Sequence, residues 1–345
     1  MAVLLATSWE AGIKDYYSQA GYTIIGALNL ITTSRTHGGG SAYALDVKNN
    51  QDVGTPTIST TARWVHGYIT PVNPLSTQTY VLTFVRGGTA TFWVRVGSGG
   101  YVELLRGYFL FMATVVATSS SPINPNISHW FAIKLEALSS GGSAEVWVDG
   151  ALVVSFSGDT RGHPSDSGWD QVYFASNNFG QSGLTPEYTI DDLIITDDST
   201  GRLAEQFCLG VRRPSSVYGG TLVGTPETNA DRWKNIDEAP TDQADYNEAS
   251  SSGEEDGYNL TNLSVPASSI LCAVVWTEAS RSGSLTQIEA SVMSNGTLVY
   301  GAPETIAASG WSSHDLILET DPDTGTAWTP AAVDSITLRA GARFS

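Results

Sequence analysis

The sequence predicts an all-β protein in which a large jelly-roll sandwich is followed by a second, smaller β-sandwich. Composition is the first reason: of the 345 residues, 41% are hydrophobic, only 15% are charged, 10% are aromatic and 35 are glycine. Such a composition suits twisted, turn-rich sheet better than helix. Hydropathy is the second reason, because short segments alternate apolar and polar residues along the whole chain, and a 3.6-residue period is nearly absent.

Alternating segments define the strands of the first body. A hairpin is centred on residues 149–150, an Asp-Gly pair that fits the two-residue type I′ turn. This turn places Val148 opposite Ala151. Further along the hairpin, Val146 lies opposite Val153. We predict other strands at Thr89–Val96, His129–Glu136 and Tyr188–Thr196, with Phe131, Ile133 and Leu135 pointing inward, and one short helical turn within Ser8–Ser18.

A polar, turn-forming segment at residues 197–201 ends the strands of the first body, so we predict one domain over residues 1–200 and a second over 201–345. An acidic irregular segment, 237–258, lies in the second; between Asp237 and Asp256 it holds eight acids and no base. We interpret it as a solvated loop, with a cation or basic-partner site as the alternative. We predict strands of the second domain at Phe207–Arg213, Ser269–Trp276, His314–Glu319 and Ser335–Phe344. A hairpin over Ile288–Tyr300 turns at Asn295-Gly296. The predicted packing anchors of this domain are Trp276, Trp311 and Trp328.

Charge and cysteine content exclude several classes of function. The chain has 17 basic and 35 acidic residues, a net charge of −18, and would repel phosphate backbones and anionic lipid headgroups. We therefore expect no nucleic-acid partner and no membrane partner. The first residues lack a basic leader, so we expect synthesis in the cytosol without a signal peptide. Cys208 and Cys272 form no CxxC pair; we interpret both as small buried residues, with a disulfide as the alternative.

Catalytic and metal-binding motifs are absent from the sequence. It has no GxSxG, HExxH or P-loop pattern, and none of its five histidines lies within four residues of another. Sugar hydrolysis needs two carboxylates that face each other, whereas the neighbours Asp191 and Asp192 should point to opposite faces of a strand, one at the sheet edge and one in solvent. Residues 321–325 begin like a calcium loop, but no glutamate closes it, which favours a plain turn with Asx hydrogen bonds. We predict no catalytic residue, no metal site and no cofactor.

One aromatic arrangement suggests a carbohydrate-binding site. Alternation places Trp64, His66 and Tyr68 on one strand face, while Trp93 and Arg95 share a face of another strand. If the two faces adjoin, they form a platform on which a pyranose ring could stack. The alternative is that these rings fill the sandwich core or a contact between subunits.

Two resemblances follow from the predicted strands. Residues 129–135, 144–150 and 188–195 resemble the Trp-initiated strand, the V-x-V-D-G hairpin and the I-D-D strand of the concanavalin A-like (laminin-G/pentraxin-type) jelly roll. That superfamily includes lectins, glucanases and non-enzymatic adhesion modules, so the resemblance implies architecture more than function. Further segments, in order, resemble a family of tailed-bacteriophage virion proteins in which such a domain precedes a smaller β-sandwich: Asp191–Gly201, Phe207–Pro214, Ile236–Pro240, Asp245-Tyr246, Asp256–Tyr258 and Thr320–Trp328.

The virion resemblance implies a structural role and supplies no catalytic residues. We therefore expect a non-enzymatic, oligomeric virion protein, associated with the tail or its fibres or decorating the capsid. Its expected partners are copies of itself and other virion proteins, with host-surface glycan as a further partner to be tested. Two alternatives remain open: a free-standing carbohydrate-binding lectin or adhesin, and a polysaccharide hydrolase.

Overall fold

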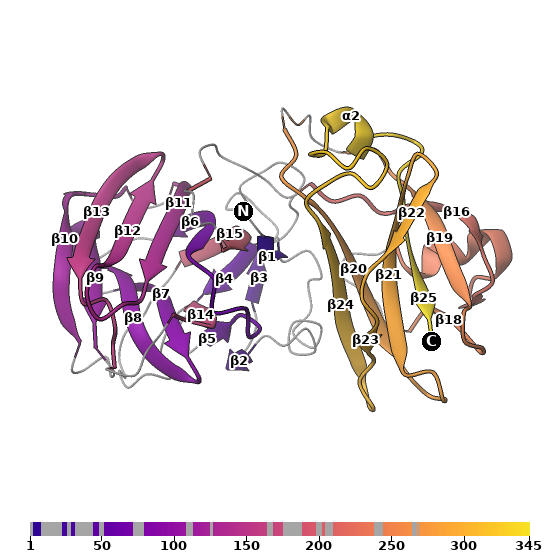
Figure 1. The fold of residues 1–345 in the computed structure, drawn as a ribbon, viewed down its shortest axis with the longest axis horizontal. Coiled ribbons are helices and arrows are strands. Elements are labelled where there is room, and N and C mark those ends of the chain that lie inside the picture. Colours follow the sequence, from indigo (N-terminus) through magenta and orange to yellow (C-terminus); the bar gives the residue numbers. More distant parts are fainter. Residues whose placement is uncertain are drawn as a thin grey trace. The chain divides into compact units, whose positions relative to one another are not determined.

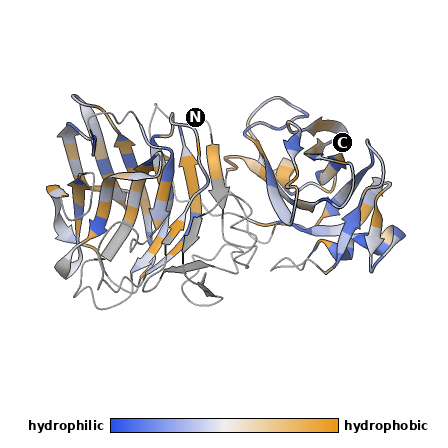
Figure 2. Cartoon of the chain, turned by 90° about the horizontal axis from the view of Figure 1, so that it is seen from below, coloured by the Kyte–Doolittle hydropathy of each residue, from blue (hydrophilic) through white to orange (hydrophobic). Residues whose placement is uncertain are grey.

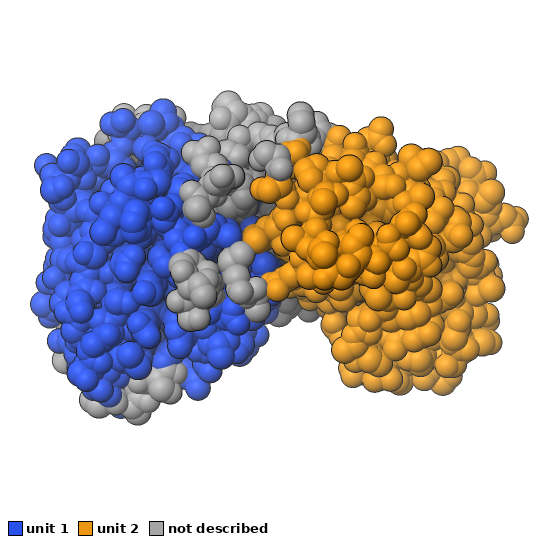
Figure 3. Space-filling view, turned by 45° about the horizontal axis from the view of Figure 1, so that its top comes forward, with its two compact units in different colours: residues 1–10, 21–209 blue, residues 11–20, 210–345 orange. Residues whose placement is uncertain are grey.

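A computed structural model of the chain describes residues 3–7, 23–25, 29–31, 44–47, 52–71, 79–107, 113–124, 127–163, 168–174, 188–197, 202–203, 210–237, 244–263, 267 and 269–345. Within these residues the chain is an all-β sandwich protein, which confirms the predicted fold class (Figure 1). The described residues form two compact units, the first reaching residue 203 and the second starting at Gly210 (Figure 3). No helix among the described residues is long and apolar enough to cross a membrane.

The first unit consists of two antiparallel sheets. In spatial order, the eight-stranded sheet contains β13 (Ala151–Gly158), β12 (Gly142–Val148), β11 (His129–Glu136), β6 (Trp64–Pro71), β15 (Tyr188–Thr196), β4 (Ala44–Val47) and β3 (Asn29–Ile31), and β1 (Val3–Thr7) also pairs with β15. The seven-stranded sheet contains β10 (Thr114–Pro122), β9 (Tyr101–Arg106), β8 (Thr89–Val96), β7 (Thr79–Arg86), β14 (Gln171–Phe174), β5 (Asp52–Gly54) and β2 (Thr23–Ile25), with the short helix η1 (Ser98–Gly100) between β8 and β9.

The core of the first unit lies between these sheets, and Trp169 connects them. Its ring meets Phe84 of β7 edge-on with centroids 4.9 Å apart, while its Nε1–H donates to the Leu135 carbonyl of β11 at 3.0 Å. Alternate residues of β12 are buried and half-buried, so one face of this sheet packs inward and the other points outward. This alternation of apolar and polar positions is visible along the strands in Figure 2. The predicted inward residues of β11 are buried as expected: Phe131, Ile133 and Leu135.

The hairpin of β12 and β13 confirms the predicted turn and corrects part of its register. Asp149 and Gly150 have positive φ angles of 49° and 83°, which a type I′ turn requires. Val148 pairs with Ala151 as predicted. Val146 pairs with Val154 rather than Val153, because a bulge shifts the register between Val146 and Trp147.

The carboxylate of Asp149 also connects this turn to β11. Its Oδ2 lies 2.6 Å from His129 Nδ1, and its Oδ1 accepts the Trp130 N–H at 3.0 Å. The second ring nitrogen of His129, Nε2, lies 2.8 Å from the Asn124 carbonyl oxygen. Through these two contacts the buried His129 ring joins the turn to the segment before β11.

One prediction for the first unit is wrong, and another falls outside the described residues. Asp191 and Asp192 are 2% and 0% exposed, so the prediction that one of them faces solvent is wrong. The pairing of β15 with β6 is irregular after Asp191, and Asp192 has a φ of 48°, so strict alternation does not hold there. The helical turn predicted within Ser8–Ser18 lies outside the described residues.

The second unit is also built from antiparallel strands. Its six-stranded sheet contains β16 (Pro214–Gly220), β19 (Glu255–Leu260), β25 (Arg339–Phe344), β21 (Gln287–Ser294) and β22 (Thr297–Tyr300), and β23 (Glu304–Thr305) also pairs with β21. Two further pairs are β20 (Ala273–Ser280) with β24 (Trp311–Leu318) and β17 (Val223–Thr225) with β18 (Tyr246–Glu248); the helices are η3 (Asn229–Asn235) and α2 (Pro330–Val333). A core of Val292, Trp328, Val333 and Leu338 packs against apolar residues of β20 and β24.

The second unit has the predicted hairpin turn, but its strands differ from the predicted ones in several places. The hairpin turns at Asn295 and Gly296 as predicted, with φ angles of 46° and 94°. β20 begins at Ala273, four residues after the predicted start. The strand predicted over 207–213 does not form at 210–213, and its other residues lie outside the described part. The acidic segment is not a loop throughout, because β18 and the start of β19 lie within it.

Of the tryptophans predicted as packing anchors of the second unit, Trp328 lies in the core and Trp276 does not, and the predicted Asx turn forms. Trp328 is 3% exposed and lies in the core, as expected. Trp276 is 37% exposed on β20, so its prediction as a packing anchor is wrong; it alternates with the core-facing residues of its strand. Trp311 is half-buried and contacts the Tyr246 ring edge-on. At the 321–325 turn, the Asp323 N–H donates to the Asp321 carboxylate at 3.0 Å, which confirms the Asx turn.

Of the two cysteines, Cys272 lies in the described part of the chain. Cys272 is a free, half-buried thiol rather than a fully buried residue. Removal from water, followed by the nearby charge of Glu319, raises the pKa of Cys272 to about 11. The thiol is therefore protonated and weakly reactive at neutral pH. Cys208 lies outside the described residues.

Candidate functional site: an aromatic face of the first unit

The residues predicted to bind carbohydrate lie on two different sheets. Trp64, His66 and Tyr68 alternate along β6 of the eight-stranded sheet, whereas Trp93 and Arg95 belong to β8 of the seven-stranded sheet. None of the five is more than 9% exposed. The hypothesis that they form one open platform is therefore wrong, because alternation shows which residues share a strand face but not which strands are neighbours.

Trp93 and Arg95 have local partners on their own sheet. Trp93 packs in a small apolar cluster with Ala90 and Leu105. Arg95 forms an ion pair with Glu103 of the neighbouring strand β9. Both side chains are therefore already engaged within the first unit, so we do not retain them in the candidate site.

The face that carries Trp64, His66 and Tyr68 continues across β11 and β12. Tyr68 lies opposite Trp130 in the β6–β11 register, and Ala132 of β11 lies opposite Trp147 of β12. Directly opposed residues share a face of the sheet, and the half-buried Trp147 shows that this face points away from the core. We call it the aromatic face and define it by Trp64, His66, Tyr68, Trp130, Lys134, Glu145, Trp147 and Arg202.

The solvent exposure of the side chains on the aromatic face increases from β6 toward β12. At β6 the rings are covered: Trp64 and Tyr68 are 4% and 3% exposed, and Trp64 stacks on His66 with centroids 5.8 Å apart. Toward β12 the face opens, since the Lys134 and Glu145 side chains are 26% and 27% exposed. The accessible part of the aromatic face is thus the end at Trp147.

Arg202 lies over the two tryptophans of this open end. Its guanidinium carbon is 4.3 Å from the centre of the Trp147 ring and 5.2 Å from that of the Trp130 ring, within the range of cation–π attraction. It also donates a long hydrogen bond of 3.4 Å to the Leu203 carbonyl. Among the described residues, no carboxylate forms an ion pair with Arg202.

The remaining charges of the aromatic face neutralise one another. Glu145 accepts the Trp147 Nε1–H at 2.9 Å, and its other oxygen lies 3.9 Å from Lys134 Nζ. The bond to Glu145 holds the Trp147 indole in one orientation. With Lys134 and Glu145 matched, the charge left over on this face is the positive charge of Arg202.

The sequence alone contains enough information to predict part of this site. Trp130 directly precedes Phe131, which is predicted to point inward, so alternation places Trp130 on the outer face of the strand. Trp147 follows from the hairpin register in the same way. Arg202 had no such signal, because it comes after the last strand of the first unit and reaches the face only through the tertiary fold.

A second polar group, in the second unit, has the atomic order of an acyl-transfer triad. Ser312 Oγ lies 2.9 Å from His314 Nε2, and His314 Nδ1 lies 3.0 Å from Glu304 Oε2. Ser312, however, is only 8% exposed, and its Oγ also accepts the Ala307 N–H at 3.0 Å and donates to the Ala279 carbonyl at 3.2 Å. A serine whose hydroxyl is buried and bound on several sides serves packing, so we assign this group a structural role.

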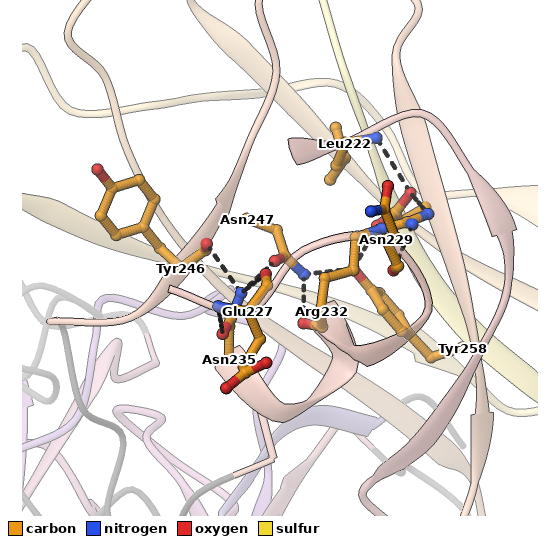
Figure 4. Close-up of polar contacts among 9 residues, drawn as sticks. Leu222, Glu227, Asn229, Arg232, Asn235, Tyr246, Asn247 and Tyr258 are labelled. Atoms are coloured by element: carbon orange, nitrogen blue, oxygen red, sulfur yellow. Dashed lines mark hydrogen bonds and ion pairs between the residues drawn. The ribbon is translucent and has the colours of Figure 1, made fainter. Parts of the chain in front are cut away.

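A buried polar network joins η3 of the second unit to β19 (Figure 4). Arg232 donates from Nε and Nη2 to the two carboxylate oxygens of Asp256, at 2.5 and 2.7 Å. The Tyr258 hydroxyl donates to Asp256 at 2.7 Å, and Asn247 donates to the Tyr258 oxygen at 2.7 Å. Burial, and then the Asp256 charge, raises the pKa of Tyr258, which therefore keeps its proton as a donor. These side chains satisfy one another in the interior, so the network contributes stability rather than a binding site.

Neither a family model nor a curated protein matches the chain. Domain 4 of a GH43 extracellular arabinanase from Geobacillus stearothermophilus, solved with arabinotriose, is 12% identical, covers 56% of this chain and 91% of its own, and has a TM-score of 0.40. A carbohydrate esterase from the Shiga toxin-encoding bacteriophage phi24B is 11% identical, with 56% and 97% covered and a TM-score of 0.39. A heptameric SAP-like pentraxin from Limulus polyphemus is 14% identical, with 41% and 66% covered and a TM-score of 0.31.

Proposed function

We propose that this chain is a non-enzymatic structural protein of a bacteriophage particle, and that it attaches the particle to a surface glycan through the aromatic face of its first unit. The observation that carries the binding role is the open end of that face. There Trp147 is held by Glu145 beneath the guanidinium of Arg202, beside Lys134.

The chemistry of this open end suits a sugar. A pyranose ring presents an apolar C–H face that packs on an aromatic ring, and hydroxyl groups that pair with charged side chains at its rim. Leu152, opposite Trp147 on β13, is 47% exposed and extends the apolar surface. Because the Trp147 indole is already oriented by Glu145, binding would cost little ordering of the site.

The role in a particle is supported by the sequence resemblance to virion proteins and by the first unit's edge. β10 is an edge strand of its sheet, and most of its residues, including Val115 at 40%, are exposed. An exposed edge strand offers its backbone N–H and C=O groups to a neighbouring chain. We propose that copies of this chain and other virion proteins use such surfaces during assembly.

Membership of a particle has a direct test. Gold-labelled antibody against this chain should decorate intact particles purified from a lysate of the host that carries the gene. A control antibody against a host cytosolic protein should leave them bare. Unlabelled particles, with all of the chain in the soluble fraction and none in denatured particles, would contradict the virion role.

Glycan attachment is tested by Trp147→Ala on a glycan array, followed by titration of any glycan bound. The wild-type protein should bind without releasing reducing ends, and the variant should bind at least about tenfold more weakly because the stacking surface is lost. Trp276→Ala is the matched control, since it removes an exposed tryptophan of the second unit. A folded Trp147→Ala variant with unchanged affinity contradicts the site, and cleavage of the bound glycan contradicts the non-enzymatic role.

A further inference from the structure

Arg202 differs from most arginines of the first unit. Four of those described form an ion pair with a carboxylate: Arg86, Arg95, Arg106 and Arg161. Arg63 bonds to the backbone carbonyls of Thr60 and Ala62. Arg202 instead lies over two indole rings, in a chain whose net charge is −18 and which has acids in excess.

The stacked position leaves most of the Arg202 donors available. A guanidinium group has five N–H donors in its plane, arranged to match a carboxylate or sulfate with two parallel bonds. The cation–π contact with the two indole rings supplies no oxygen acceptor to these N–H donors. The one hydrogen bond from Arg202 that the described residues show, to the Leu203 carbonyl, is 3.4 Å long and therefore weak.

Among the described residues, the positive charge of Arg202 has no carboxylate as an ion-pair partner. Lys134 lies near Glu145, and Glu145 also accepts the Trp147 indole hydrogen. Of the charged residues that define the aromatic face, an anion that approaches Trp147 thus meets the Lys134–Glu145 pair and the unpaired Arg202. The partly buried setting also strengthens the attraction, because a pair that is less exposed to water and salt is less screened.

We propose that the aromatic face binds an anionic saccharide, with the carboxylate or sulfate group held by Arg202 while the sugar ring packs against the exposed Leu152 and the part of Trp147 that Arg202 does not cover. This inference rests on the proposed glycan-binding function and names the chemical class of its ligand. Uronic-acid and sulfated sugars share the required chemistry: a planar or tetrahedral oxyanion attached to a ring with an apolar face.

Matched pairs of immobilised polysaccharides test the ligand class. The probes are polygalacturonic acid against its fully methyl-esterified form, and dextran sulfate against dextran, each at low and high salt. The wild-type protein should bind at least one anionic member about tenfold or more tightly than its neutral partner. Equal binding of both members of each pair, still sensitive to Trp147→Ala, overturns the inference and leaves the proposed function standing. Binding to none of the four, with no glycan found on the array, counts against the proposed function itself.

Variants of Arg202 assign the effect to its guanidinium. Arg202→Gln should reduce binding of the anionic member to the level of its neutral partner. Arg202→Lys keeps the charge but not the two-bond geometry, and should keep only part of the preference. Arg281→Gln removes one positive charge from the second unit and is the control for general electrostatics. Near-ultraviolet circular dichroism checks that the tryptophans stay packed; a folded Arg202→Gln variant that keeps the full preference overturns the inference.

Discussion

Asp256→Asn should lower the free energy of unfolding of the second unit by about 3 kcal/mol, because it breaks a buried ion pair from one side. Asp256 is 2% exposed and accepts from Arg232, from the Tyr258 hydroxyl and from the Leu222 N–H. The amide has no charge to offset that of Arg232, which is itself 7% exposed. Urea unfolding followed by tryptophan fluorescence and circular dichroism measures the loss.

Two further variants separate the buried pair from general effects of charge. Asp231→Asn also removes an acid, from within η3, but the Asp231 side chain is 59% exposed beside Lys234, so the unfolding midpoint should not change measurably. Adding Arg232→Gln to Asp256→Asn should recover part of the loss, since no buried charge is then left alone. If Asp256→Asn and Asp231→Asn shift the midpoint equally, the buried pair does not have the stabilising role assigned to it.

Trp169→Ala should destabilise the first unit by about 3–5 kcal/mol, the range for removing a large aromatic side chain from a packed core. Trp169 is fully buried and connects the two sheets, through its edge contact with Phe84 and its hydrogen bond to the Leu135 carbonyl. The substitution would leave a cavity between the sheets and an unpaired carbonyl. The transition of the first unit in urea, or its melting temperature, reports the effect.

Trp169→Phe divides this effect into packing and hydrogen bonding. An aromatic ring remains, although a smaller one, so much of the packing against Phe84 should survive, and the loss should be about 1–2 kcal/mol, mainly for the missing donor. Trp276→Ala, which removes an exposed ring from the other unit, should leave this transition unchanged. A Trp169→Ala variant as stable as the wild type would contradict the bridging role of Trp169.

Strand positions were the most predictable part of the fold. Thr89–Val96, His129–Glu136 and Tyr188–Thr196 have the predicted bounds, and both hairpin turns, at 149–150 and 295–296, form as predicted. Alternation and turn dipeptides are local properties, so a few neighbouring residues contain the information. The errors occur where a distant contact overrides the local pattern. A bulge moves the partner of Val146, and Arg232 draws Asp256 out of solvent into the core.

For the candidate site, too, some features follow from local sequence and others from contacts between distant segments. The sequence by itself determined that Trp64, His66 and Tyr68 share a strand face, that Trp130 lies on the outward side of its strand, and that the chain is an acidic all-β protein. Only the tertiary structure decided that Trp93 and Arg95 belong to the other sheet, that the β6 rings are covered, and that Arg202 lies over Trp147. The physical reason is that side-chain direction repeats every two residues, whereas sheet membership and burial depend on pairings between segments far apart in the chain.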